Sequence, residues 1–437
     1  MDCYGFLSRT QSEQVWYSKI RTFVKVSWIG YYSFETSLAH RFNKYSHATR
    51  SKKIDINFKL MRLLTQTFKS KGKRSMLIIF SILLACIAIL VVVLIAHSPG
   101  KPKSFTDGNG KTLTGSISEK IHVNINGIKQ GMFIKGKDVT KPVLLFLHGG
   151  PGFPEYAISY KYPIVLENNF VVCWWEQRGA GLSYCSDIPL ESMTFDQLTS
   201  DILEVTKYLC KRFGQDQIYL MAHSGGTFIG IQAAARSPEL YKAYIAVSQM
   251  SYQLESEKLA YKYMIEQFTR LGDKKMLRKF EKYSINDLNT SSYYTMRDAP
   301  MHKLGVGTTH QMASIISGVF WPVMLNKEYT LCEKINIWRG KSFTTKKAQL
   351  WSDMALTDLT KKVQKLNIPV YFFHGIYDFT ISYPMAKDYF EKLQAPIKGF
   401  YTFKQSAHSP LFEESAKIQQ ILQKDILTGT NSLADTK

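Results

Sequence analysis

Residues 217–226 read QIYLMAHSGG, an apolar run that ends in a serine set among small residues. A short apolar run before such a turn predicts a buried strand that leads into a helix. Ala222 and Gly226 lie two positions either side of Ser224 and are small enough for the backbone to turn tightly and expose the hydroxyl. Alone this is weak evidence, because glycine turns after strands are common and the usual form has glycine where Ala222 stands.

Similar apolar runs recur along the chain. They occupy residues 142–149, 170–177, 243–249, 369–375 and 399–403, and residues 120–137 alternate as a hairpin does. Helix-like stretches such as 195–213 and 228–236 lie between them. Strands that alternate with helices predict an α/β fold with a mostly parallel sheet covered on both faces.

The rhythm stops between residues 251 and 353, where the pattern is helical without a strong strand. We interpret this interval as a helical cap inserted into the α/β core. The predicted organisation is a basic N-terminal arm (1–75), a transmembrane anchor (76–96), a linker (97–110), the first part of the core (111–250), the cap (251–353) and the second part of the core (354–430).

The predicted anchor runs from Met76 to Ala96 and contains 21 residues without a charge or a proline. At about 1.5 Å per residue, a helix of this length matches a hydrocarbon core of roughly 30 Å. A buried core helix is rarely apolar on every face for six turns. A cleaved signal peptide usually has an apolar region of only about 7–15 residues. We therefore expect one uncleaved transmembrane helix.

The charge distribution agrees with a membrane location. Fifty-six basic side chains against 35 acidic ones give a net charge of +21, and residues 1–75, with 15 basic and 4 acidic side chains, carry +11 of it. Four basic residues between positions 69 and 74 precede the apolar run, so the positive-inside rule predicts a cytoplasmic N-terminus and an extracytoplasmic domain at the cell membrane. Nucleic acid is not an expected partner, because no zinc-finger, helix-turn-helix or RNA-binding motif occurs.

Four cysteines fall in the predicted external domain, where a disulfide is permitted: Cys173, Cys185, Cys210 and Cys332. Their spacing matches no zinc pattern, and we predict no metal site. Cys173 stands inside an apolar run and is expected to be a buried thiol. The sequence leaves open whether any pair is bonded.

A glycine-rich turn follows another apolar run at residues 148–152, which read HGGPG. Glycines at the end of a strand let backbone N–H groups point into a cavity, where they can stabilise a developing oxyanion. We expect the N–H groups of Gly150 and Gly225 to form such an oxyanion hole. The alternative is an ordinary Gly/Pro turn after a strand.

Two later residues complete a catalytic set with Ser224. Asp378 lies three residues past Gly375, at the end of an apolar run, where ligands gather in parallel sheets. His408 follows the last predicted strand. Singly, Asp378 could cap a helix and His408 could be a packed side chain. Together they follow a known order of serine, aspartate and histidine, and we predict a catalytic triad of Ser224, Asp378 and His408.

Two other histidines are rivals for the base. His223 flanks Ser224, where its ring cannot easily turn onto the serine hydroxyl, and His374 sits inside a predicted strand end. His408 therefore remains the predicted base.

Three stretches together resemble prolyl iminopeptidases and related α/β-hydrolases: HGGPG at 148–152, WWEQRGAGLS at 174–183 and AHSGG at 222–226. The resemblance covers about residues 120–425 and implies an α/β-hydrolase fold with an inserted cap. Three positions depart from the usual family pattern. Ala222 replaces a glycine, Gly225 replaces a tryptophan, and Glu176 stands where an aspartate usually precedes QRG.

The motifs predict a serine hydrolase that cleaves an acyl bond through an acyl-enzyme, without metal or cofactor. The resemblance further implies an aminopeptidase that removes N-terminal residues from small peptides, with acidic cap residues that hold the free amine. Candidates for those acidic residues are Glu255, Glu257 and Glu266.

Two other functions stay open. One is a carboxylesterase or lipase-like acyl hydrolase that works near the membrane, and the other is a non-catalytic binding protein on a hydrolase scaffold. Epoxide hydrolase or dehalogenase chemistry would need a carboxylate nucleophile at the position of Ser224.

Overall fold

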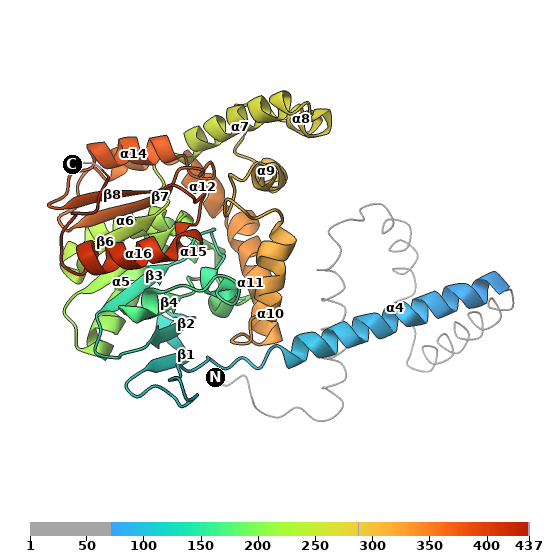
Figure 1. Ribbon diagram of the computed structural model, residues 1–437, viewed down its shortest axis with the longest axis horizontal. Helices are drawn as coiled ribbons and strands as arrows, with labels where there is room; N and C mark the ends of the chain where they lie inside the picture. The colour runs from blue at the N-terminus through green and yellow to red at the C-terminus, as the bar shows by residue number, and fades with distance from the viewer. Residues whose placement is uncertain (1–70, 287, 436–437) are drawn as a thin grey trace. The chain divides into compact units, whose positions relative to one another are not determined.

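An eight-stranded sheet with the order β1-β2-β4-β3-β5-β6-β7-β8 forms the centre of the computed structural model, which describes residues 71–286 and 288–435 (Figure 1). The β1–β2 and β2–β4 pairs are antiparallel and all other pairs are parallel. The strands span Ile117–Ile125 (β1), Ile128–Gly136 (β2), Val143–Leu147 (β3), Val171–Trp175 (β4), Ile218–His223 (β5), Tyr241–Val247 (β6), Val370–Gly375 (β7) and Lys398–Phe403 (β8).

Each apolar run predicted as a strand forms one of these strands, the alternating stretch 120–137 corresponds to the hairpin β1–β2, and the predicted mostly parallel sheet is confirmed. In β3 every residue is buried, but successive side chains enter different cores. Leu145 and Leu147 belong to one hydrophobic cluster, whereas Leu144 and Phe146 belong to the cluster on the other face. Because both faces are covered, the strand has no polar face and its sequence shows no alternation.

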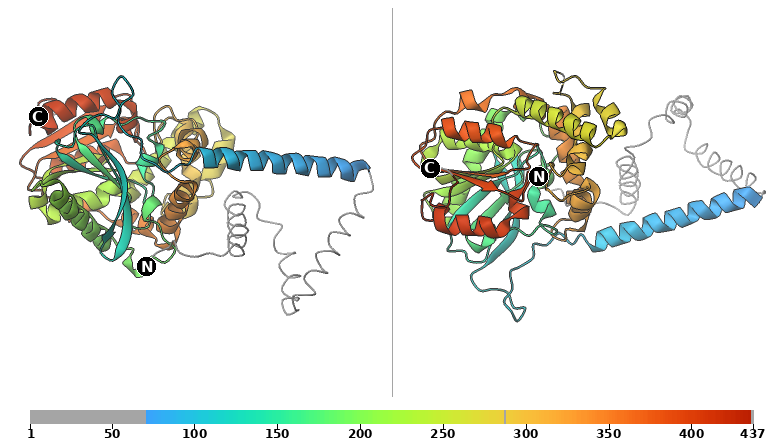
Figure 2. Two further views of the ribbon diagram at one scale, coloured as in Figure 1. Left: turned by 90° about the horizontal axis from the view of Figure 1, so that it is seen from below. Right: turned by 45° about the horizontal axis from the view of Figure 1, so that its top comes forward.

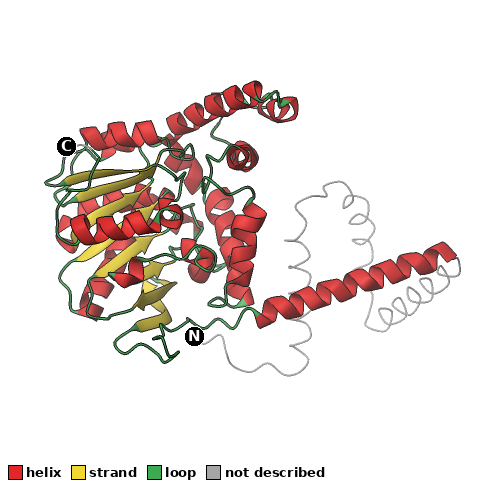
Figure 3. Ribbon diagram, in the orientation of Figure 1, coloured by secondary structure: helices red, strands yellow, loops and turns green. Residues whose placement is uncertain are grey.

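Helices cover both faces of the sheet, as Figure 3 shows. The cluster on one face contains residues of α5 (Phe195–Phe213), α6 (Gly225–Arg236) and α14 (Tyr383–Lys392). The other face is covered mainly by α16 (Ser415–Ile421) and the adjoining π-helix η8 (Leu422–Ile426). This three-layer arrangement exposes the carboxyl ends of the parallel strands at one edge, where sites of such sheets form.

The ends of α5 follow from local sequence. The Thr194 hydroxyl accepts a hydrogen bond from the Gln197 N–H (3.1 Å) and caps the first turn. Gly214 closes the last turn with a left-handed φ of 62°. α5 has the bounds of the stretch 195–213 whose pattern predicted a helix.

The chain between β6 and β7 forms helices and no strand in its described residues, as predicted for the cap. These helices group together beside the sheet in both views of Figure 2. The predicted domain limits, including 251 and 353 for the cap, stay predictions. The elements are α7 (Gln253–Arg270), α8 (Lys274–Phe280), α9 (Ser291–Lys303), η6 (Ile316–Phe320), α10 (Trp321–Leu325), α11 (Leu331–Ser342), η7 (Phe343–Lys347), α12 (Leu350–Leu356) and α13 (Leu359–Lys362).

The predicted membrane span lies in α4 (Lys71–Ala96). Its apolar part, Ser75–Ala96, is almost entirely exposed and is long and apolar enough to cross a membrane. The predicted arm lies outside the described residues as far as residue 70. The sheet, the cap and the end of α4 belong to one compact unit, Ile89–Lys437.

The described cysteines are all free thiols, including the four of the predicted external domain. Cys173 is buried in β4, as its apolar surroundings predicted. Cys185 and Cys332 are exposed and Cys210 is half-buried. The fold of the described residues therefore depends on packing and not on cross-links.

Candidate active site

Ser224 stands at the sharp turn between β5 and α6. Its backbone has φ 53° and ψ −126°, a conformation that costs an L-residue about 1–3 kcal/mol. The turn also needs Gly226, because a β-carbon there would lie 2.5 Å from the Leu147 carbonyl oxygen. The packing of the turn against β3 thus imposes the strained backbone that presents the serine hydroxyl.

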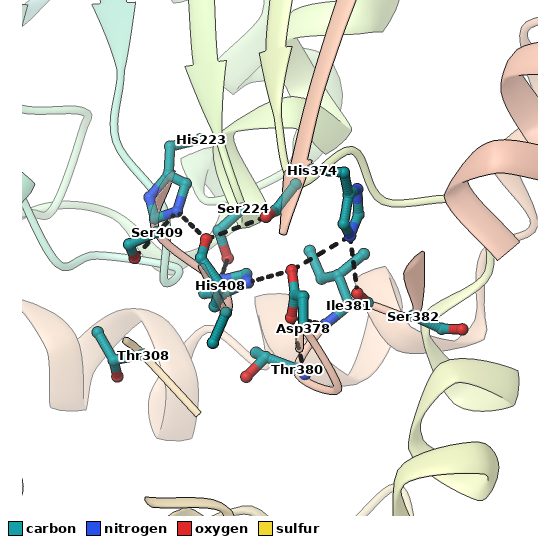
Figure 4. A network of polar contacts seen from close by, with 12 residues as sticks. His223, Ser224, Thr308, His374, Asp378, Thr380, Ile381, Ser382, His408 and Ser409 are labelled. Atoms are coloured by element: carbon teal, nitrogen blue, oxygen red, sulfur yellow. Dashed lines mark hydrogen bonds and ion pairs between the residues drawn. The ribbon is translucent and has the colours of Figure 1, made fainter. Parts of the chain in front are cut away.

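The structure brings Ser224, His408 and Asp378 into one chain of hydrogen bonds (Figure 4). His408 Nε2 lies 2.8 Å from Ser224 Oγ, and His408 Nδ1 lies 2.9 Å from Asp378 Oδ2. The three residues come from loops after β5, β8 and β7. All three are buried, and Ser224 retains 8% of its accessible surface.

Asp378 is held in its ionised form by several donors. Its Oδ1 accepts the backbone N–H groups of Thr380 and Ile381, each at 2.9 Å. Burial alone would raise the pKa of Asp378, but the adjacent His408 and His374 rings hold that pKa well below its usual value. A carboxylate fixed in this way can orient the His408 ring and stabilise its protonated form.

His374, one of the rival bases, supports Asp378 from the side away from Ser224. Its Nε2 lies 3.0 Å from the Ile381 carbonyl oxygen and 3.2 Å from Asp378 Oδ2. Both atoms are acceptors, so Nε2 must carry the proton. His374 therefore positions the carboxylate and does not reach the serine.

The HGGPG turn lies directly beside Ser224. The Gly149 N–H is already used, because it donates to both carboxylate oxygens of Glu155 at 2.9 and 3.1 Å. Within the described residues, the N–H groups of Gly150 and Gly225 donate to no protein acceptor. The Gly150 nitrogen lies 3.4 Å from where a β-carbon of residue 225 would stand. These two free donors next to the serine are the pair predicted as the oxyanion hole.

Gly225 has a packing reason that the sequence did not reveal. A β-carbon at this position would lie 2.8 Å from the Gly150 carbonyl oxygen. The HGGPG turn therefore occupies the space that the first side-chain atom of a tryptophan at position 225, usual in the resembled family, would need. A side chain at 225 requires the turn to shift.

Glu155 and His223 form a second buried pair beside the triad. His223 Nδ1 lies 2.8 Å from Glu155 Oε1, and His223 Nε2 lies 3.0 Å from the His408 carbonyl oxygen. Because Glu155 also accepts the Gly149 N–H, the pair connects the glycine-rich turn to the His408 loop. Sequence reasoning missed Glu155, since no periodicity or motif spacing marks it.

His223 faces an acceptor with each ring nitrogen, so the doubly protonated ring satisfies both contacts. Burial alone would lower its pKa, but the hydrogen bond and negative charge of Glu155 raise the pKa above its usual value. The His223 ring centroid lies 5.0 Å from that of His408. Burial lowers the pKa of His408, and the positive charge of His223 lowers it further.

The EQRG stretch braces the glycine-rich turn from outside the site. The Gln177 N–H donates to His148 Nε2 (3.0 Å), and its side-chain amide donates to the His148 carbonyl oxygen (2.7 Å). Arg178 forms a buried bidentate ion pair with Asp201 of α5, at 2.7 and 3.0 Å. This stretch is therefore a structural support and contributes no group to the triad.

Glu176, the departure from the usual aspartate, is buried and holds the following loop. It accepts the Leu182 N–H at 2.5 Å and a hydrogen bond from the Tyr329 hydroxyl. Burial raises the pKa of Glu176 to about 8. Glu176 thus links the loop to the cap.

The three predicted amine-binding carboxylates lie on α7 and have different surroundings. Glu255 pairs with Lys258, and Glu266 pairs with Arg270 at the exposed surface. Glu257 is fully buried, and its Oε1 lies 3.1 Å from the Arg297 guanidinium. The structure therefore turns only Glu257 toward the interior.

The cap contacts both sides of the site. The His408 N–H donates to the Gly307 carbonyl oxygen (3.2 Å), and the Phe379 N–H donates to the Val306 carbonyl oxygen (3.4 Å). On the other side, the Thr344 hydroxyl donates to the Pro151 carbonyl oxygen at 3.2 Å. In Figure 4 Thr308 lies across from the triad. These contacts leave the serine almost covered.

Comparisons with known proteins agree on the fold. The sequence profile of the alpha/beta hydrolase fold matches residues 142–415. The probable aminopeptidase YbaC of Bacillus subtilis (strain 168) is 28% identical over 323 residues, which is 71% of this chain and 96% of that protein. A proline iminopeptidase of Saccharolobus solfataricus is 23% identical over 305 residues, 65% of this chain and 84% of that protein. The crystal structure of VinJ, 15% identical, has a TM-score of 0.50 and covers 71% of this chain and 98% of its own.

Proposed function

The chain belongs to the alpha/beta hydrolase fold family, and from this premise we propose that it is a serine hydrolase that cleaves an acyl bond. The observation that carries the proposal is the hydrogen-bonded chain from Ser224 through His408 to Asp378. Ser409 Oγ also lies near a histidine with a carboxylate behind its ring, but at 3.5 Å from His223 Nε2. That nitrogen already faces the His408 carbonyl oxygen at 3.0 Å, whereas His408 Nε2 faces the Ser224 hydroxyl at 2.8 Å.

In the proposed reaction, His408 takes the Ser224 proton while Oγ attacks the acyl carbon. The N–H groups of Gly150 and Gly225 stabilise the tetrahedral oxyanion. Asp378 stabilises the imidazolium, which then protonates the leaving group. Water, activated by the same histidine, releases the acyl group and restores the serine.

A fluorophosphonate probe tests the nucleophile, because it reacts with activated serines. The wild type should be labelled, and Ser224→Ala should not be, with unchanged circular dichroism. Ser186→Ala, which changes an exposed serine, is the matched control and should label like the wild type. Equal labelling of the Ser224→Ala protein contradicts the assignment, and an unlabelled wild type favours the non-catalytic binding protein.

For the substrate we propose the N-terminal residue of a small peptide, in keeping with the names of the two relatives. Of the three acidic candidates, Glu257 suits an amine best. Its Oε2 is buried and has no partner among the described residues. Gln253 donates to Glu257 Oε1 (2.9 Å) and to the Thr380 carbonyl oxygen (2.7 Å), so Glu257 is linked to the Asp378 loop.

Arylamide substrates test this specificity. Cleavage of prolyl or alanyl arylamides should be lost on N-acetylation, because a pocket built for a charged amine rejects a blocked one. Glu257→Gln should raise KM for arylamides, whereas Glu255→Gln and Glu266→Gln, at solvent-facing pairs, should leave KM unchanged. Equal KM values for all three variants would rule out Glu257 as the amine site.

A carboxylesterase is the second candidate, favoured by the ion pair between Glu257 and Arg297. A carboxylate that already faces a guanidinium attracts a substrate ammonium less strongly. The esterase proposal predicts fast turnover of short-chain p-nitrophenyl esters and inert arylamides. If the fluorophosphonate probe labels Ser224 and the protein shows this activity pattern, the esterase proposal replaces the peptidase proposal.

We also propose that α4 anchors the chain in the cell membrane, with the N-terminus in the cytoplasm. Support comes from the apolar helix Ser75–Ala96 and the basic residues before it. Protease added outside intact cells or spheroplasts should then remove the domain after Lys101 and spare the segment before the span. Protection of that domain in intact cells, with digestion after lysis, would reverse the orientation.

A further inference from the structure

An exposed apolar face lies on a short helical segment of the cap, formed by η6 and α10. Residues 312–325 contain no charged side chain. Ile316, Phe320 and Trp321 are 64%, 37% and 38% exposed, whereas Val319 and Val323 are buried. Ile316 and Phe320 are four residues apart, about one helical turn, and the adjacent rings of Phe320 and Trp321 lie 5.3 Å apart, so the three exposed side chains are neighbours on the surface. We call Ile316, Phe320 and Trp321 the apolar face.

This segment is tied to the exit of the apolar helix α4. The buried Lys334 ammonium donates to the His97 carbonyl oxygen, to the Ser98 hydroxyl and to the Met324 carbonyl oxygen, each at 2.8 Å. His97 directly follows the last apolar residue of α4, and Met324 belongs to α10. One side chain therefore holds the end of α4 and the segment of the apolar face together.

Backbone contacts fix the same junction. The Gly100 N–H donates to the Lys327 carbonyl oxygen (3.1 Å), and Pro99 forms a bridge with Thr330. The approach at Gly100 is close, since a β-carbon there would lie 2.4 Å from the Thr330 methyl group. Leu94, in the last turn of α4, is 4% exposed. The linker after α4 is thus packed onto the cap.

We propose that the apolar face lies in the interfacial layer of the bilayer that α4 crosses, and this inference rests on the proposed anchor. A span that ends at Ala96 sets the membrane surface close to His97, and Lys334 holds His97 next to α10. Aromatic side chains favour the level of the lipid headgroups, and a helix enters that layer without unpaired backbone groups. The covalent anchor makes this contact intramolecular, so even a small apolar face is sufficient.

The surroundings of the apolar face suit an interface with lipid. Lys161 donates to the Ser317 carbonyl oxygen (3.1 Å), so a flexible cation borders the segment and its ammonium can reach the headgroups. A second copy of the chain is the rival occupant. Such a dimer would have to bury the three side chains while each copy keeps its own anchor in the membrane.

Tryptophan quenching by brominated lipids tests the proposal in the full-length chain. The protein is reconstituted in phosphatidylcholine vesicles with and without bromine on the acyl chains. The wild type should show bromine-dependent quenching, and Trp321→Phe should lose a clear part of it. Trp351→Phe, which removes a half-buried cap tryptophan in edge-to-face contact with Tyr294, is the matched control and should keep that part.

Flotation with the vesicles separates the proposal from its premise. All three proteins should float; a chain that stays in the soluble fraction overturns the anchor and the inference with it. Chains that float but show equal quenching in Trp321→Phe and wild type overturn the inference alone. If the Ile316→Cys protein forms disulfide-linked dimers in the vesicles and the wild type shows no bromine-dependent quenching at Trp321, the apolar face binds a second copy of the chain and not lipid.

Labelling by the fluorophosphonate probe should be the same in the Trp321→Phe and Trp351→Phe proteins. This readout reports folding of the catalytic region and is independent of lipid contact. Loss of labelling together with loss of quenching would attribute the effect to misfolding and would remove the support for the membrane contact.

Discussion

Two buried histidine–carboxylate pairs flank Ser224 with nearly the same geometry. His408 Nδ1 lies 2.9 Å from Asp378, and His223 Nδ1 lies 2.8 Å from Glu155. The pairs differ at the other ring nitrogen. His408 Nε2 faces the Ser224 hydroxyl, whereas His223 Nε2 faces the His408 carbonyl oxygen.

The atom opposite Nε2 decides what each histidine can do. A hydroxyl can donate or accept, so His408 can be neutral and take the serine proton. A carbonyl oxygen only accepts, so His223 must keep its Nε2 proton to make the contact. Each pair joins a histidine Nδ1 to a carboxylate, Asp378 in one and Glu155 in the other, and the group opposite Nε2 is what favours His408 as the proposed base.

Removing the first histidine should have the largest effect. We expect His408→Ala to lower kcat by about 10⁶-fold, as expected for loss of a residue that acts as a unit with its serine. Steady-state kinetics on the best arylamide or ester measures it, and the double variant with Ser224→Ala should be no slower. A further large fall in the double variant would show that His408 does not act through Ser224.

The carboxylate of the first pair comes next. In Asp378→Asn the amide nitrogen can face His408 Nδ1, which then favours the wrong tautomer, and we expect a fall in kcat of about 10⁴-fold. The Thr380 and Ile381 N–H groups can still bond the amide oxygen, so the fold should persist. An unchanged thermal unfolding curve is the control, and near wild-type kcat would refute the role of Asp378.

The second pair should matter less and in a different way. Glu155→Gln keeps an acceptor for the Gly149 N–H but removes the charge beside His223. A small displacement of the glycine-rich turn and the His408 loop should lower kcat about 10- to 100-fold with little change in KM. Leu190→Ala, an exposed change away from the site, is the control. A fall in kcat as large as that of His408→Ala would mean that the Glu155–His223 pair is as important for turnover as the His408–Asp378 pair.

The smallest expected effect is a shift in pH dependence. kcat/KM requires neutral His408 and falls as the pH drops through its pKa. In Glu155→Gln, His223 loses the anion that stabilises its protonated ring and becomes neutral. The His408 ring then faces the Asp378 carboxylate and the His374 ring without the His223 charge, so the pKa of His408 rises. The acid limb of the profile should move to higher pH by less than about one unit.

An unchanged pH profile of kcat/KM in Glu155→Gln would show that the charge of the second pair does not affect the pKa of His408. It would mean that Glu155 acts only through the position of the turn. A shift to lower pH would contradict the protonated state assigned to His223. The measurement uses one substrate and a series of buffers at constant ionic strength.

Much of the fold follows from the sequence because strands and helices have local signals. The apolar runs predicted strands β3 to β8, the alternating stretch 120–137 predicted the hairpin β1–β2, and the Thr194 cap and Gly214 stop set the ends of α5. The packing of these elements against one another cannot be predicted from the same local signals. Gly225 stands where the resembled family usually has tryptophan, and only the packing shows that a β-carbon there would lie 2.8 Å from the Gly150 carbonyl oxygen.

In the cap, the sequence did not predict which acidic residues are buried. Three glutamates of α7 were equal candidates for an amine site, because no motif marks which of them faces the site. The fold buries Glu257 against Arg297 and leaves Glu255 and Glu266 in surface pairs. Exposed ion pairs of this kind contribute little to stability. Among the three glutamates, only the buried Glu257 stays a candidate for the amine site.

The sequence by itself determined the apolar helix, the alternating strands and helices, and the order of Ser224, Asp378 and His408. These depend on periodicity, turn chemistry and length, which neighbouring residues encode. Only the tertiary structure decided that Glu155 pairs with His223 across 68 residues, and that Lys334 ties the cap to the end of α4. Such contacts join distant segments whose approach depends on how the layers pack, and no local pattern specifies that approach.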